Sequence, residues 1–290
     1  MEQLKNKIQI FLTITFLGFL GWWASFQRVV TAPVQGKSIG WFGATYGFVA
    51  LVGAILGFIA ARKWGGFKST LGRALMFLSL ALFAQEAGQL ISAYYVYGKH
   101  LDALPYPSWG DVAFFGSTIF YICGGLYLAK AVGVRFSLKS NLYKLIAFII
   151  PVALLIASYS VFLHHHTYDW SNHLTVFLDA GYPLGDAVYI SLAIIAYLLS
   201  IRTLGGIMRT GILILIVAFV AQYASDWTFL YQTSRNKAIA GQYYDLLYLI
   251  TYFIAGTAMI KFLRVYKELQ SKAAKAASEN ATKEHTKEAA

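Results

Sequence analysis

Residues 73–97 read RALMFLSLALFAQEAGQLISAYYVY. After the opening arginine, the only charged side chain in this stretch is Glu86. Apolar residues do not alternate with polar ones here, as they would along a half-buried strand. About 20 apolar residues cross the hydrocarbon core of a bilayer as a helix. The segment therefore predicts a transmembrane helix that carries Gln85, Glu86 and Gln89 inside it.

The same apolar character extends over the whole chain. Hydrophobic residues make up 58 % of the 290 residues and charged residues 13 %, about half the charged share of a soluble domain. This composition excludes a soluble enzyme, a disordered protein and a collagen-like fibre. Besides 73–97, stretches of spanning length lie at 8–27, 41–61, 111–131, 142–163, 178–201, 207–231 and 243–264. The predicted fold class is all-α, a polytopic membrane protein with eight transmembrane helices.

The basic residues predict the orientation of these helices. If the N-terminus is cytoplasmic, 19 of the 24 lysines and arginines fall on the cytoplasmic side and five on the outer side. Such a split follows the positive-inside rule. We expect a multi-pass plasma-membrane protein with both termini in the cytoplasm. The net charge of +11 then follows the lipid bilayer and does not indicate a nucleic-acid partner.

Two regions are expected along the chain. Residues 1–266 form the eight-helix transmembrane domain, and residues 267–290 form a polar cytoplasmic tail. The tail is rich in Ala, Lys and Glu, and we expect either a frayed helix or disorder there.

An internal repeat of helical hairpins is predicted from three similar segments. FAQEAGQ at 83–89 corresponds to VAQYASD at 220–226, and each is followed by a short outer loop. A helix that opens near an acid comes next, with Asp111 after the first segment and Asp245 after the second. A third opening, YPLGD, lies at 182–186. Self-similarity of this kind is typical of repeated supersecondary units.

Three short motifs carry a resemblance to a known family. PSWGDVAFF at 107–115, YPLGD at 182–186 and YDLLY at 244–248 resemble the multi-helix N-terminal membrane sensing region of bacterial diguanylate cyclases and histidine kinases. The likeness covers about two thirds of the chain. It implies a membrane sensing module, and because no output domain follows the last helix here, a separate cytoplasmic partner for signalling.

Polar side chains within the spans form the predicted ligand site. Acids at membrane depth are costly and are functional candidates by default. Gln85 and Gln89 share a helix face with Glu86 offset, and Gln222 and Asp226 repeat the four-residue spacing. We expect these five to line an outward-facing polar pocket for an unidentified small ligand. The alternative is interhelical hydrogen bonding.

Three acids are expected at the outer ends of helices: Asp111, Asp186 and Asp245. An acid in the first turn of a helix offsets the positive end of its dipole. Ser108 and Asp111 have the spacing of a capping box, and Pro183 suits a first turn. We predict that all three cap helices; an acidic outer rim is the alternative.

Two further patterns complete the candidate sites. His164 and His166 lie in a loop that is otherwise polar, and they are candidate metal ligands; pH sensitivity or an ordinary loop are the alternatives. The pairs Gly43/Gly47 and Gly53/Gly57 have the spacing that lets two helices approach closely. No motif identifies a cofactor.

Three functions remain open on these grounds. The first is a sensory or ligand-binding membrane protein that signals through a separate partner. The second is a small-molecule or proton-coupled transporter in which Glu86 and Asp226 exchange protons. The third is a membrane enzyme acting on lipid-linked substrates through the outer aspartates and the histidine loop.

Overall fold

The computed structural model describes residues 2–27, 41–101, 105–132, 141–160, 170–200, 207–233 and 241–288. All regular structure in these ranges is helical, as the sequence predicts. The long helices are α1 (Glu2–Gln27), α3 (Phe48–Lys63), α4 (Thr70–Ala93), α5 (Trp109–Ala131), α6 (Asn141–Ser158), α7 (His173–Ser200), α8 (Arg209–Thr233) and α9 (Tyr243–Glu288). A 3-10 turn at Gly66–Lys68 precedes α4, and a π-helical turn at Tyr94–Gly98 extends it.

Seven helical segments of the described chain are long and apolar enough to cross a membrane. They match seven of the eight predicted spans. The predicted span at 142–163 corresponds to α6, whose described apolar run, Phe148–Ala157, is shorter than the rest. An eighth span therefore stays a prediction.

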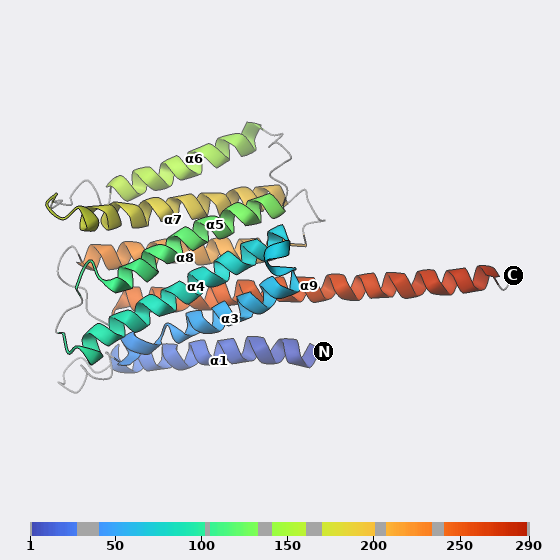
Figure 1. Ribbon diagram of the computed structural model, residues 1–290, viewed down its shortest axis with the longest axis horizontal. Helices are drawn as coiled ribbons and strands as arrows, with labels where there is room; N and C mark the ends of the chain where they lie inside the picture. The colour runs from blue at the N-terminus through green and yellow to red at the C-terminus, as the bar shows by residue number, and fades with distance from the viewer. Residues whose placement is uncertain are drawn as a thin grey trace.

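Six of the helices pack as a closed ring. Following the main contacts, α3 packs on α4, α4 on α5, α5 on α7, α7 on α8, α8 on α9, and α9 back on α3. Helix α1 lies outside the ring against α9 and α3, and α6 lies outside it against α7; Figure 1 shows these two at opposite edges of the bundle. The ring brings helices that are distant in sequence, such as α3 and α9, into direct contact.

Glycines set the closest approaches within this ring. A Cβ on Gly53 would lie 3.3 Å from the Cα of Gly256 in α9, and one on Gly57 would collide with the Ser79 hydroxyl of α4. A Cβ on Gly124 of α5 would come within 2.7 Å of Leu78. The predicted packing role of Gly53 and Gly57 is confirmed, because only the missing side chains allow α3 this close to two neighbours.

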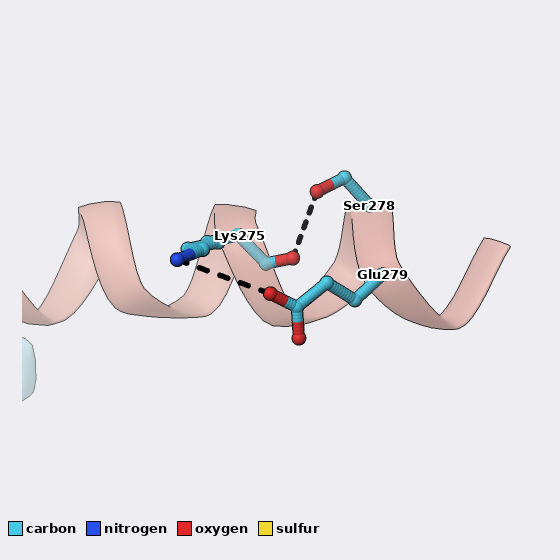
Figure 2. A network of polar contacts seen from close by, with 3 residues as sticks. All are labelled: Lys275, Ser278 and Glu279. Carbon is cyan, nitrogen blue, oxygen red and sulfur yellow. Dashed lines mark hydrogen bonds and ion pairs between the residues drawn. The ribbon is translucent and has the colours of Figure 1, made fainter. Parts of the chain in front are cut away.

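Helix α9 is far longer than the predicted span at 243–264. It runs for 46 residues, and Figure 1 shows it leaving the bundle and continuing alone toward the C-terminus. The N-terminus lies at the same end of the bundle. The projecting part carries two ion pairs spaced by one helical turn, Lys272–Glu268 at 2.8 Å and Lys275–Glu279 at 4.0 Å; Figure 2 shows the second. Of the two expectations for residues 267–290, the structure has a helix through Glu288.

Candidate functional site

Gln85 ties three helices together inside the ring. Its side chain is 5 % exposed. The amide Nε2 donates to the hydroxyl of Ser117 on α5 at 2.7 Å, and Oε1 accepts from the hydroxyl of Tyr252 on α9 at 3.0 Å. A buried amide with both ends bonded specifies the positions of its neighbours, because losing either bond leaves a polar group unsatisfied.

Gln222 and Asp226 of α8 contact each other directly, as their four-residue spacing allows. Nε2 of Gln222 donates to both carboxylate oxygens of Asp226, at 3.1 and 3.2 Å. The hydroxyl of Tyr248 on α9 donates to Oδ1 of the same carboxylate at 2.5 Å. Asp226 is therefore held by its own helix and by α9.

Two tyrosines of α9 connect these groups. Tyr248 and Tyr252 are four residues apart, and their rings are stacked with centroids 6.2 Å apart. One bonds Asp226 and the other bonds Gln85. We call these residues, together with Asp186 and Tyr189 of α7 that lie beside Asp226, the polar core: Gln85, Ser117, Asp186, Tyr189, Gln222, Asp226, Tyr248 and Tyr252. The structure thus joins predicted residues of the α4–α5 and α8–α9 hairpins through α9.

Asp186 belongs to the polar core and does not cap a helix, so that prediction is wrong. Helix α7 begins at His173, thirteen residues before Asp186, and Asp186 is 1 % exposed. The helix starts early because Asn172 supplies the cap, accepting from the backbone N–H of Thr175 at 3.2 Å. Pro183 lies inside α7 and not in its first turn.

Glu86 and Gln89 face a different neighbour from Gln85. Both are directed toward α3 and the helical turn before it. Nε2 of Gln89 donates to the carbonyl of Gly43, and Oε2 of Glu86 lies where a Cβ on Gly47 would be. That oxygen is buried and has no hydrogen-bond partner in the described part of the chain. The face shared by Gln85 and Gln89 in the sequence is therefore divided between two packing partners.

The capping prediction for Asp111 is confirmed. Ser108 accepts from the backbone N–H of Gly110 at 3.1 Å, and Asp111 Oδ2 accepts from the backbone N–H of Ser108 at 2.7 Å, which completes a capping box. Asp111 Oδ1 also accepts from the hydroxyl of Tyr182 on α7 at 3.2 Å. This acid fixes the start of α5 and its contact with α7.

A second acid contact lies beside it at the same end of α7. The hydroxyl of Tyr106, in the loop before α5, donates to Asp179 at 2.6 Å. Burial and then this hydrogen bond to the carboxylate raise the pKa of Tyr106. Its phenol therefore stays protonated and keeps donating at any physiological pH.

Asp245 caps α9, again as predicted. It lies in the first turn, and Oδ2 accepts from the backbone N–H of Gly241 at 2.5 Å. Gly241 has a φ of 83°, which favours glycine because a side chain is strained there. The carbonyl of Gly241 accepts from Trp23 Nε1 at 3.0 Å and from Gln27 Nε2 at 2.8 Å. This turn joins the end of α1 to the start of α9.

Sequence reasoning missed the tyrosines of the polar core. Tyr189 and Tyr252 are fully buried, and Tyr248 holds Asp226. The signal available was the four-residue spacing of Tyr248 and Tyr252, which is the same as that of Gln222 and Asp226. The predicted metal ligands His164 and His166 lie outside the described residues.

Comparison of the chain with protein-family models, with curated proteins and with solved structures finds no match.

Proposed function

We propose that the chain is an integral membrane protein of the plasma membrane with both termini in the cytoplasm. The spanning lengths of the helices support insertion, as do large apolar side chains exposed on the outside of the bundle, among them Phe11, Ile14 and Leu17 of α1 and Phe148 of α6. The distribution of basic residues supports the orientation. The bilayer is the partner that covers those apolar faces.

Its function in this proposal is sensory. A small ligand binds at the polar core, and binding shifts the position of α9. One observation carries the proposal: α9 supplies Tyr248 and Tyr252 to the polar core and then continues as one helix to Glu288, outside the bundle. A ligand that competes for Gln85 or Asp226 changes the free energy of holding α9 where it is. Because α9 is one continuous helix, a shift of its buried part also moves its projecting end.

The projecting part of α9 is the surface to which a cytoplasmic partner would bind in response to this shift. Its side chains from Glu268 to Asn280 are exposed and alternate between basic, acidic and small residues. A partner that binds this segment only in one position of α9 would couple the site to an output. The short motifs at 107–115, 182–186 and 244–248, which resemble membrane sensing regions, agree with this function.

A distance measurement tests the coupling. Spin labels are placed at Ser278 on the projecting helix and at Lys68 in the turn between α3 and α4, in a Cys123→Ser background. We expect the distance distribution to shift in the double variant Tyr248→Phe/Tyr252→Phe. The control is Tyr266→Phe, which removes a hydroxyl whose bond to Gln270 is exposed. An unchanged distribution in the double variant contradicts the sensory proposal.

A transporter is the second candidate, and one observation favours it. Asp186 and Asp226 face each other inside the bundle with no basic side chain paired to either in the described chain. Intramembrane carboxylates of this kind mark ion pathways in carriers. Proton flux into proteoliposomes that is lost in Glu86→Gln or Asp226→Asn would favour this candidate over the sensor.

We also infer that the bundle contains related hairpins. In α4–α5 and in α8–α9, an acid early in the second helix accepts a backbone N–H just ahead of that helix, Asp111 from Ser108 and Asp245 from Gly241. In both hairpins a glutamine on the first helix, Gln85 or Gln222, belongs to the polar core. Two independent features at corresponding positions support the repeat.

A further inference from the structure

Four buried oxygen atoms at the contact of α7 with α8 have no hydrogen-bond partner among the described residues. They are both carboxylate oxygens of Asp186, the hydroxyl oxygen of Tyr189 and Oε1 of Gln222. The three side chains are 1 %, 0 % and 2 % exposed. Buried polar atoms are normally paired, because an unpaired one costs about 1–3 kcal/mol. Four such atoms together require a common explanation.

The charges of the neighbouring acids also call for a bound partner. Asp226 faces Asp186 across the α7–α8 contact, so two carboxylates lie side by side, Asp186 buried and Asp226 partly buried. The groups that face them from the surrounding helices are uncharged: Tyr121 from α5, Tyr189 from α7, Gln222 from α8 and Tyr248 from α9. No ion pair to Asp186 or Asp226 is found in the described chain. Nothing there offsets the two negative charges.

A shared proton accounts for only part of this arrangement. One proton between the two carboxylates satisfies one oxygen of Asp186, and the hydroxyl of Tyr189 can turn toward the other. Oε1 of Gln222 still lacks a donor, since the Nε2 of that amide is already bonded to Asp226. The pair also keeps one uncompensated negative charge, which is costly in a buried site.

We propose that Asp186, Tyr189, Gln222 and Asp226 bind one hard inorganic cation. All the atoms available as metal ligands are oxygens, and carboxylate, amide and hydroxyl oxygens are the ligands that such cations prefer. A cation bound between the two acids would supply a partner for the oxygens of Asp186, Tyr189 and Gln222 that have none. Two carboxylates balance a calcium ion completely, or a sodium ion together with one retained proton. No group of three His, Cys, Asp or Glu side chains forms in the described chain, and the four proposed residues include no His or Cys, the ligands that zinc and copper prefer.

This inference names a ligand for the sensory site proposed above. Its role in signalling rests on the proposed function, but the binding itself can be measured independently. Ion binding at α7 and α8 is measured directly, without reference to α9. Asp226 links the cation site to α9, because it faces Asp186 and accepts a hydrogen bond from Tyr248 of α9. Occupancy of the cation site therefore changes the acceptor that holds α9.

Calorimetry on the full chain tests the site. The protein is purified in detergent, stripped of cations with a chelator, and titrated with calcium chloride or sodium chloride while choline chloride keeps the ionic strength constant. We expect saturable binding of one ion per chain for one of the two salts, with a rise in Tm. Asp186→Asn should abolish the binding. Tyr189→Phe, which keeps the ring and both charges, should weaken it roughly tenfold.

Two matched controls lie on the same helix. Asp179→Asn removes a carboxylate that bonds Tyr106 outside the polar core, and Tyr197→Phe removes a hydroxyl that accepts from Arg209. Both should bind the ion as the native chain does. If Asp186→Asn does not fold, the comparison of Tyr189→Phe with Tyr197→Phe decides.

Three results would overturn the cation site. They are no binding of either ion beyond the choline blank, equal binding in the variants at Asp186 and Tyr189, or a Tm that depends on pH but not on either ion, which identifies a shared proton. Spin labels at Ser278 and Lys68 separate this from the sensory proposal. An ion that binds without moving α9 leaves the cation site standing and rejects the sensor.

Discussion

Tyr248 of α9 donates a 2.5 Å hydrogen bond to Asp226 of α8. The same carboxylate accepts twice from Gln222 of its own helix and faces Asp186 of α7. One acid is therefore shared by three helices of the ring. Contacts of this kind set the relative positions of helices whose outer faces are apolar and give little positional information by themselves.

Removing the Tyr248 hydroxyl should destabilise the bundle measurably. We expect Tyr248→Phe to lower the free energy of unfolding by about 1–2 kcal/mol, because the partly buried carboxyl group of Asp226 loses a hydrogen-bond donor. Unfolding in mixed detergent micelles measures the change. The control Tyr266→Phe should lie within about 0.5 kcal/mol of the native chain. Equal values for the two variants would contradict the assigned role of the bond.

The contact between Gly47 and Glu86 predicts a second effect on stability. Gly47→Ala places a Cβ against the carboxylate oxygen at the flexible end of Glu86 and beside Gln89, and we expect a loss of about 1 kcal/mol, the low end of overpacking costs. The double variant Gly47→Ala/Glu86→Ala should recover much of it, since the truncated side chain makes room. Gly18→Ala in α1 is the matched control, because no atom lies within 4 Å of a Cβ there. Absence of recovery in the double variant would place the collision elsewhere.

The capping box at the start of α5 gives a third prediction. Ser108→Ala should cost about 1 kcal/mol, the usual value for a lost N-cap. Ser108→Thr keeps the oxygen and should be nearly neutral. The thermal unfolding of both variants, followed by circular dichroism, checks the difference. A loss of the same size in Ser108→Thr would mean that packing of the side chain matters more than the cap.

The ion pair on the projecting helix should contribute little. The side chains of Lys275 and Glu279 are 80 % and 60 % exposed, with 4.0 Å between Nζ and Oε1. Figure 2 shows this pair. Exposed pairs at this spacing are worth about 0.3–0.5 kcal/mol. We expect the helical circular dichroism of Lys275→Ala to match the native signal within error at low and high salt. A large, salt-dependent loss would show that ion pairs maintain this segment.

Topology is the fifth prediction. In a Cys123→Ala background, a cysteine at Ser278 should react with an impermeant maleimide only in inverted membrane vesicles. A cysteine at Lys99, which follows the π-helical turn at the opposite end of α4, should react only in right-side-out vesicles. Labelling of both positions from the same side would reject the eight-helix orientation, and the reversed pattern would place the termini outside.

Hydropathy alone predicted the helices well, because a membrane-spanning helix requires a continuous apolar stretch of about 20 residues that is visible in the sequence. It placed the start of α7 at residue 178 where the helix begins at His173, since a polar cap at Asn172 and an interior proline both look like loop signals. Capping acids were predictable for the same local reason: Asp111 and Asp245 act within four residues of themselves.

The partners of the polar residues were not predictable in this way. Periodicity says that Gln85 and Gln89 lie near one face of a helix, but the neighbours of that face depend on the order of helices around the ring. Gln85 accepts a hydrogen bond from Tyr252, 167 residues later in the chain, while Gln89 donates one to the carbonyl of Gly43. No local pattern distinguishes those outcomes. Asp186 was misassigned for a related reason, since its neighbour Asp226 lies on another helix.

The carbonyl of Gly241 has a consequence for how the protein is made. It accepts from Trp23 and Gln27, so the first helix synthesised is bonded to the turn that precedes the last helix. Helix α3 likewise waits for Gly256 of α9 to close against Gly53. Residues before α9 therefore leave the ribosome as an open row of helices with unfilled contacts. The arrival of α9 completes the assembly, and a chain truncated before residue 241 should be recognised by membrane quality control as unfinished.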